Sequence, residues 1–277
     1  MAYITLNQVE HYYEWICDGQ PGHRPILVFL HGWGGSARYW ESTAQIMKAD
    51  FDCLLYDLRG FGRSKAAIET SPELGMLESF AEDLAQLLDA LKLERVFINA
   101  HSMGASVALY FLNRFSPRVE KAILTCNGSF EYDKRSFEAF QKFGGYVVAF
   151  RPSWLVHIPL APQILMSRFL KRQIHYADKK VFLNDFLQAD PATAMGTLKA
   201  SVSKHATETM PAAFTSLDVP TLMVSGEYDR ITPAELGRQA ASLNTQIEYA
   251  EIPKTGHFPM LEDSSTYLSI INAFLSK

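Results

Sequence analysis

The first residue suited to catalysis is a serine at the junction of an apolar run and an apolar helical segment. Ser102 is the central residue of the string Ala-His-Ser-Met-Gly at 100–104. This small-x-Ser-x-small pattern is typical of a nucleophile elbow, because the tight turn presses the second residue on either side against other backbone. Ala100 stands where glycine is usual, and Gly104 keeps the more restricted position. The context predicts Ser102 as a nucleophile; the alternative is a serine in a tight turn with no chemical role.

A candidate acid and a candidate base follow further along the chain. Asp229 comes after the apolar run 220–225 and before a helical segment, and His257 comes after the last apolar run, 247–252. A serine hydroxyl becomes a good nucleophile when a histidine takes its proton, and a carboxylate holds that histidine in the required tautomer. The order Ser102, Asp229, His257 is the order expected when the three follow strands of one α/β sheet.

Other carboxylates compete for the role of the acid. Glu227 lies two residues before Asp229 and is the nearest rival. In some related arrangements the acid follows the strand that here ends at Cys126, but that position holds Asn127 and then glycine. Glu131 and Asp133 lie further on. Asp229 therefore remains the preferred acid, with a role as a turn or capping residue as its alternative.

A glycine-rich loop at 31–35 (His-Gly-Trp-Gly-Gly) follows the first run expected to be a parallel strand. Backbone N–H groups in such a loop can approach a substrate oxygen, so we predict an oxyanion hole made by the N–H groups of Trp33 and Met103. His31 is interpreted as a structural hydrogen-bonding residue. Candidate substrate contacts are Trp33, His101, Phe130, Phe143 and Phe258, although His101 also suits a packing role.

The elements that must position these residues alternate along the chain. Residues 3–17 predict a hairpin, and short apolar runs predict buried strands at 25–30, 53–56, 95–99, 119–126, 220–225 and 247–252. Helical spacing marks 37–49, 73–92, 103–115, 233–243 and 264–276. This alternation predicts an α/β fold, with a mostly parallel sheet and helices on both faces.

The alternation stops at 128–216, a segment that is aromatic, mainly helical in pattern and broken by five prolines. We predict a core domain from 1–127 and 217–277 with 128–216 inserted as a helical cap, or lid. The segment holds 11 Lys/Arg against 7 Asp/Glu, whereas the rest holds 15 against 23. This basic balance reflects either chance placement of solvated side chains or an anionic partner or acidic carrier near the cap. Residues 146–166 are too interrupted to span a membrane but permit contact with a lipid-like substrate.

Composition narrows the remaining possibilities. The 277 residues carry a formal net charge of −4, which gives no indication of nucleic-acid binding. The three cysteines are scattered and odd in number, which suits a reducing compartment. No signal peptide or apolar run of transmembrane length is visible, so a cytoplasmic protein is expected. No side chains show metal-ligand spacing, and we expect neither a metal nor a cofactor.

Taken together, the loop at 31–35, the segment 57–64, the elbow and the loops of Asp229 and His257 resemble the α/β-hydrolase superfamily. The resemblance is to its serine-nucleophile branch of esterases, perhydrolases and carbon–carbon-bond hydrolases. It implies an eight-stranded, mostly parallel sheet with a helical cap, and a serine esterase that acts on a small or medium apolar substrate through an acyl-enzyme. The alternatives are a thioesterase or acyltransferase on carrier-bound acyl groups, a carbon–carbon-bond hydrolase, and a non-catalytic receptor of the same fold. Carbon–carbon-bond hydrolases usually carry Asn before the serine, so His101 argues against them.

Overall fold

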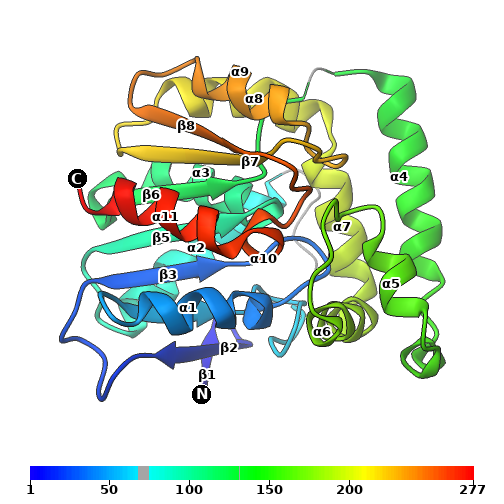
Figure 1. Ribbon diagram of the computed structural model, residues 1–277, viewed down its shortest axis with the longest axis horizontal. Helices are drawn as coiled ribbons and strands as arrows, with labels where there is room; N and C mark the ends of the chain where they lie inside the picture. The colour runs from blue at the N-terminus through cyan, green and yellow to red at the C-terminus, as the bar shows by residue number, and fades with distance from the viewer. Residues whose placement is uncertain (68–74, 131) are drawn as a thin grey trace.

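A single mixed sheet forms the centre of the computed structural model, which describes residues 1–67, 75–130 and 132–277. Its eight strands have the order β1-β2-β4-β3-β5-β6-β7-β8 (Figure 1). Only the pairs β1–β2 and β2–β4 are antiparallel; β4, β3, β5, β6, β7 and β8 run parallel. The strands are β1 Ala2–Leu6, β2 Val9–Ile16, β3 Ile26–Leu30, β4 Asp52–Tyr56, β5 Val96–His101, β6 Val119–Thr125, β7 Thr221–Gly226 and β8 Ile247–Ile252. The predicted α/β class and mostly parallel eight-stranded sheet are confirmed.

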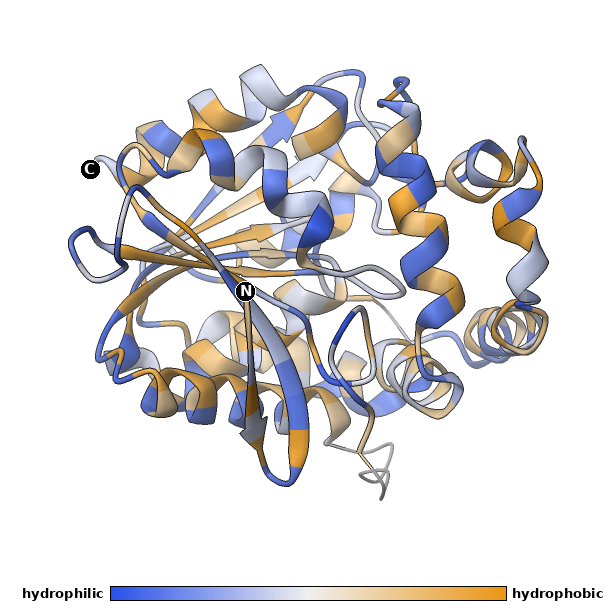
Figure 2. Cartoon of the chain, turned by 90° about the horizontal axis from the view of Figure 1, so that it is seen from below, coloured by the Kyte–Doolittle hydropathy of each residue, from blue (hydrophilic) through white to orange (hydrophobic). Residues whose placement is uncertain are grey.

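Helices cover both faces of this sheet and enclose two apolar cores. One core lies under α2 (Met76–Ala90), α3 (Met103–Arg114), α8 (Lys204–Thr215) and α9 (Ala234–Ala241). The other lies under η1 (Ala37–Trp40), α1 (Glu41–Met47), α10 (Pro259–Glu262) and α11 (Ser264–Leu275). Figure 2 shows largely apolar strands between helices in which hydrophobic and hydrophilic residues alternate along the ribbon. Strands β3 and β4 are buried at every residue, as expected when helices cover both faces.

Two expected helices differ from their observed form. The segment 37–49 begins as the 3₁₀ turn η1, whose cap Ser36 accepts a hydrogen bond from the N–H of Arg38, and continues as the short α1. The expected helix 73–92 is observed as α2, and its first two residues, 73 and 74, lie outside the described residues. A short 3₁₀ turn, η2 (Ser116–Arg118), also joins α3 to β6.

Helices are the only regular secondary structure in the described part of the long connection between β6 and β7. They are α4 Lys134–Ala149, η3 Ser153–His157, α5 Ala161–Met166, α6 Tyr176–Gln188, α7 Pro191–Ser201 and α8. In Figure 1, α4 to α7 stand together at one end of the sheet, whereas α8 contacts α3 and α9 on its face. We propose that the chain divides into the core and cap expected from the sequence, with α8 as the element that joins them.

Hydrogen bonds tie this helical segment to the loops at the sheet edge, and three of them involve the loops that follow β3 and β4. The Trp33 indole N–H donates to Ala194 O at 2.8 Å, and Ser36 Oγ donates to Asp185 Oδ2 at 2.5 Å. The N–H of Asp190 donates to Gly60 O at 2.8 Å. Within the described ranges, no helix combines the length and apolar character needed to cross a membrane.

Candidate active site

Ser102 occupies a strained turn between β5 and α3. Its φ of 53° and ψ of −121° lie outside the regions that side-chain-bearing residues favour. The turn is held by the Ser102 N–H, which donates to Thr125 O at 2.9 Å. A Cβ at Gly104 would overlap His31 O and lie 2.9 Å from Leu30 O, so only glycine fits there without a backbone shift. The elbow expected from the small residues therefore has a direct steric cause.

His257 connects the serine to a buried carboxylate. Its Nε2 lies 3.0 Å from Ser102 Oγ, and its Nδ1 lies 2.7 Å from Asp229 Oδ2. The other oxygen of Asp229 accepts the N–H groups of Ile231 at 2.7 Å and Thr232 at 3.1 Å. Asp229 and His257 are 5% and 3% exposed, so water does not compete with this chain of hydrogen bonds. Such geometry lets a histidine accept the serine proton while the carboxylate orients its ring.

The two rival carboxylates among the described residues, Glu227 and Asp133, are not in this position. Glu227 accepts the N–H of Lys254 at 2.8 Å and is exposed. Asp133 is also exposed at the beginning of the cap segment. Glu131 lies outside the described residues.

Two candidate backbone donors belong to residues that line the cavity next to the serine. Among the described residues, the N–H groups of Trp33 and Met103 have no hydrogen-bond partner. Met103 begins α3, where the first N–H groups have no intrahelical acceptor. The neighbouring Gly32 N–H donates to Tyr39 OH at 2.5 Å, which fixes the start of the glycine-rich loop. The oxyanion hole expected at these two N–H groups stays a prediction.

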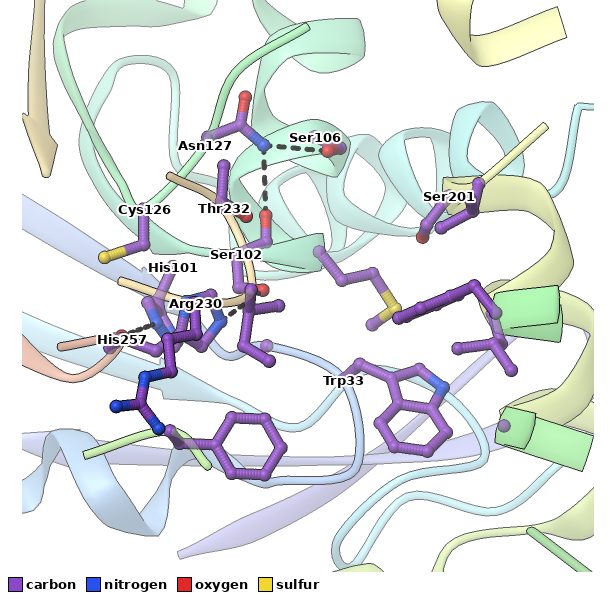
Figure 3. Close-up of a pocket in the computed structure, with 18 of the residues that line it drawn as sticks. Trp33, His101, Ser102, Ser106, Cys126, Asn127, Ser201, Arg230, Thr232 and His257 are labelled. Carbon is purple, nitrogen blue, oxygen red and sulfur yellow. Dashed lines mark hydrogen bonds between the residues drawn. The ribbon is translucent and has the colours of Figure 1, made fainter. Parts of the chain in front are cut away.

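A cavity of about 390 Å³ opens onto Ser102 (Figure 3). Its lining includes all five candidate substrate contacts, namely Trp33, His101, Phe130, Phe143 and Phe258. Phe258 is buried and packs edge-on against Tyr39, whereas Phe143 is 63% exposed. The remaining lining is mostly apolar, with aromatic rings from α4 and α6. An apolar group of small or medium size fits such a space.

The histidine next to the nucleophile is engaged by the protein itself. His101 Nδ1 lies 2.9 Å from Tyr39 OH, and its Nε2 lies 2.7 Å from the backbone oxygen of His257. Burial, followed by the proximity of His257, holds the pKa of His101 well below its usual value. A neutral ring with both nitrogens engaged supports the packing interpretation, and its direct contact with substrate stays a prediction.

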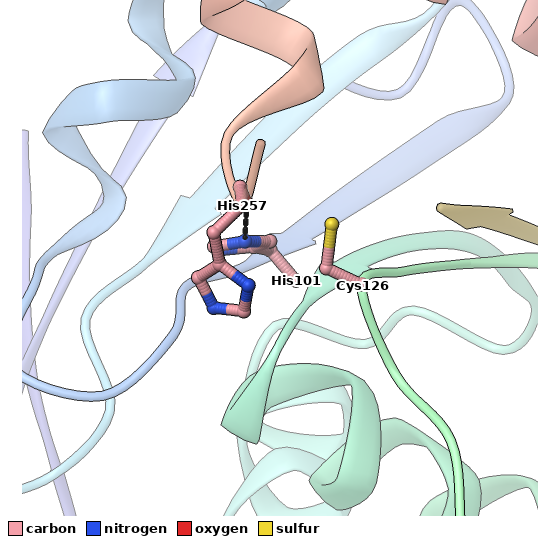
Figure 4. A group of neighbouring side chains, drawn as sticks. All are labelled: His101, Cys126 and His257. Atoms are coloured by element: carbon pink, nitrogen blue, oxygen red, sulfur yellow. Dashed lines mark hydrogen bonds between the residues drawn. The ribbon is translucent and has the colours of Figure 1, made fainter. Parts of the chain in front are cut away.

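A cluster of two histidines and a cysteine beside the site was not predicted from the sequence. His101, Cys126 and His257 bring ligand-type atoms within 4.8 Å of one another (Figure 4). The ring nitrogens of His257 are occupied by Ser102 and Asp229, and those of His101 by Tyr39 and the His257 backbone. Burial, then the charge of Asp229, raises the pKa of the Cys126 thiol well above its ordinary value. A protonated thiol and engaged imidazoles do not favour metal ligation.

Four further residues of the cavity lining were not predicted from the sequence. Tyr39, Phe169, Arg168 and Arg230 all line the cavity. Arg230 directly follows the predicted acid, a position that could have drawn attention to it. Tyr39 and Phe169 are brought to the site by contacts between distant segments, which no local pattern reports.

Comparison with known proteins agrees with this geometry. The family model for the alpha/beta hydrolase fold matches residues 25–264. The chain belongs to this family. It is 25% identical over 293 residues to the proline iminopeptidase of Heyndrickxia coagulans, with 94% of this chain and 93% of that protein covered. The resemblance to the α/β-hydrolase superfamily is confirmed.

Solved structures of this family share the fold at low sequence identity. The enol-lactonase from Burkholderia xenovorans LB400 matches this α/β hydrolase with a TM-score of 0.80, 19% identity and 100% coverage of both chains. A thermophilic esterase from Thermogutta terrifontis gives a TM-score of 0.79 and 23% identity, covering 99% of this chain and 97% of that one. At these identities the likeness shows the common fold and leaves the substrate to be argued from the site.

Proposed function

We propose that this α/β hydrolase is a serine esterase that cleaves carboxylic esters with a small or medium apolar acyl group. The observation that carries the proposal is the hydrogen-bonded series Ser102–His257–Asp229 at the floor of an apolar cavity. The mostly apolar lining of this cavity, about 390 Å³ in volume, supports an acyl group of small or medium size.

The reaction begins when Ser102 Oγ attacks the ester carbonyl carbon and passes its proton to His257 Nε2. The carbonyl oxygen becomes an oxyanion, which the N–H groups of Trp33 and Met103 stabilise together with the N-terminal end of α3. His257 then protonates the leaving oxygen as the carbon–oxygen bond breaks, and an acyl-enzyme remains. Asp229 keeps the Nδ1 proton of His257 in place and stabilises the imidazolium.

Water completes the cycle. His257 removes a proton from a water molecule as that molecule attacks the acyl carbon. Collapse of the second tetrahedral intermediate releases the carboxylic acid and returns the proton to Ser102 Oγ. The proton transfers between Ser102 and His257 are supported by side chains that already stand within hydrogen-bonding distance.

A thioesterase or acyltransferase would use the same residues. The basic cap segment favours this second candidate, because an acyl carrier of acidic character would be attracted to it. A non-catalytic receptor is the third reading. The cytoplasmic location expected from the cysteines stays a prediction.

The first test is hydrolysis of p-nitrophenyl esters from acetyl to palmitoyl by the wild type, Ser102→Ala and His257→Ala. We expect turnover with an optimum at short or medium chains and its loss in both variants. Labelling by a fluorophosphonate probe, absent in Ser102→Ala, is the matching readout. Folded protein that neither hydrolyses an ester nor reacts with the probe would favour the receptor; labelling without turnover would favour the acyl-carrier substrate.

A further inference from the structure

Two arginines share the otherwise apolar cavity with the catalytic candidates. Arg168, just after α5, and Arg230, just after Asp229, both line it. Among the described residues neither forms a hydrogen bond or an ion pair, and no Asp or Glu belongs to the described lining. Guanidinium groups left unpaired at the edge of a mostly apolar cavity create a positive potential that no carboxylate of the described lining neutralises.

Both arginines belong to segments that contact His257. Arg230 is adjacent in sequence to Asp229, which holds the His257 ring. Arg168 is adjacent to Phe169, whose backbone oxygen accepts the His257 N–H at 2.7 Å and whose ring centroid lies 6.0 Å from that of His257. In Figure 3, Arg230 and His257 are drawn on one side of Ser102, with Trp33 on the other.

The position of the two arginines relative to His257 indicates which part of the substrate they contact. His257 must donate a proton to the departing oxygen, so the leaving group passes beside His257. The acyl group lies away from it, among the aromatic rings of α4, which line the cavity as Phe137, Phe140 and Phe143. A positive site next to His257 therefore meets the leaving group.

We propose that Arg168 and Arg230 bind an anionic group, a carboxylate or a phosphate, carried by the leaving alcohol or thiol of the substrate. Guanidinium groups suit both anions because their paired N–H groups match two oxygens at once. The preferred substrate thus joins an apolar acyl group to an anionic leaving group. This inference rests on the proposed ester-cleaving function and names its substrate class.

The kinetic test uses three butanoyl esters that differ only in the leaving group: meta-hydroxybenzoate, meta-hydroxyphenyl phosphate and the neutral meta-hydroxybenzamide. We expect kcat/KM for the charged esters to exceed that for the neutral one by about tenfold. Whichever charged ester has the larger kcat/KM shows whether the site prefers a carboxylate or a phosphate. Because both arginines are solvent-exposed, added salt should reduce the preference. Equal values for all three esters would overturn the proposal.

Two variants test whether the preference for charged esters arises at Arg168 and Arg230. The double variant Arg168→Gln/Arg230→Gln should lose the preference, so that its kcat/KM values for the charged and neutral esters become equal. Arg95→Gln removes a positive charge that is paired with Glu120, outside the cavity lining, and should leave the preference unchanged. Loss of the preference in Arg95→Gln as well would attribute it to net charge and refute a local site.

A charge on the acyl side tests the orientation. Monophenyl succinate and phenyl succinamate differ by a carboxylate on the acyl group, and we expect the wild type to show no preference for the charged member. An arginine-dependent preference here as large as that for the leaving-group series would refute the assigned side.

Binding separates this proposal from the proposed function. The product meta-hydroxybenzoate should bind Ser102→Ala more tightly than meta-hydroxybenzamide by calorimetry, and the difference should vanish when both arginines are also replaced. If the anion binds in this way but no ester is hydrolysed, the proposed function fails and the anion site stands. If esters are hydrolysed but the two products bind equally, the function stands and the site is refuted.

Discussion

Replacing Gly104 by alanine should damage both stability and catalysis, although alanine is the better helix former. Gly104 is the second residue of α3 and lies against the end of β3. The new Cβ would overlap His31 O and approach Leu30 O to 2.9 Å. Both atoms are backbone carbonyl oxygens, so no side-chain rotation relieves the contact.

Two opposing contributions determine how much the Gly104→Ala substitution changes the free energy of unfolding. Alanine gains about 1 kcal/mol over glycine in a helix interior. Insertion of a methyl group into a tightly packed contact costs about 1–3 kcal/mol, and more where backbone must move. Because backbone must move here, the cost lies near the upper end of that range, and we expect a net loss of about 2 kcal/mol in the free energy of unfolding. Because Ser102 is two residues away, a displacement of about 1 Å should lower kcat by about 10²-fold.

Gly145→Ala provides the matched control. Gly145 also lies within a helix, α4, and its added Cβ would meet only Met195 Cε, at the end of a flexible side chain, at 3.4 Å. This variant should be neutral or stabilised by up to about 1 kcal/mol. Urea unfolding and ester hydrolysis measure both effects. A Gly104→Ala protein with wild-type unfolding free energy and kcat would refute the steric account of the elbow.

Three further perturbations follow from the buried groups. Asp229→Asn should lower kcat on the order of 10³–10⁴-fold with little change in far-ultraviolet circular dichroism, because it removes the charge that orients His257; near-normal turnover would place the acid elsewhere. Burial raises the pKa of Asp185 to about 6, because its effect is larger than the opposing effects of the Ser36 hydrogen bond and the Arg38 charge. The folded protein therefore binds more protons than the unfolded chain between about pH 4 and 6. The free energy of unfolding of the wild type, relative to that of Asp185→Asn, should therefore fall on the order of 2 kcal/mol as the pH rises from about 4 to 6. Denaturant unfolding of both proteins at these two pH values measures the difference, and an unchanged difference would contradict the raised pKa. The raised pKa of buried Cys126 predicts that iodoacetamide modifies it in urea and not in the native protein, as peptide mapping would reveal.

Sequence alone determined the fold class and the residues brought together at the candidate site. Buried parallel strands appear as short apolar runs, and their alternation with helical spacing predicts the sheet. Ser102, Asp229 and His257 each follow such a run, and the carboxyl ends of parallel strands share one edge. The hydrogen bonds among the three side chains are therefore the expected consequence of three local patterns.

Tertiary structure alone decided what surrounds these residues. The engagement of His101, the burial of Cys126 beside it and the meeting of Arg168 with Arg230 in one cavity all join segments far apart in the chain. Local periodicity reports which face of an element is apolar, but not which distant element covers that face. The helices between β6 and β7 pack through many weak non-local contacts, so the sequence predicted their helical character, and only the fold placed their side chains around Ser102.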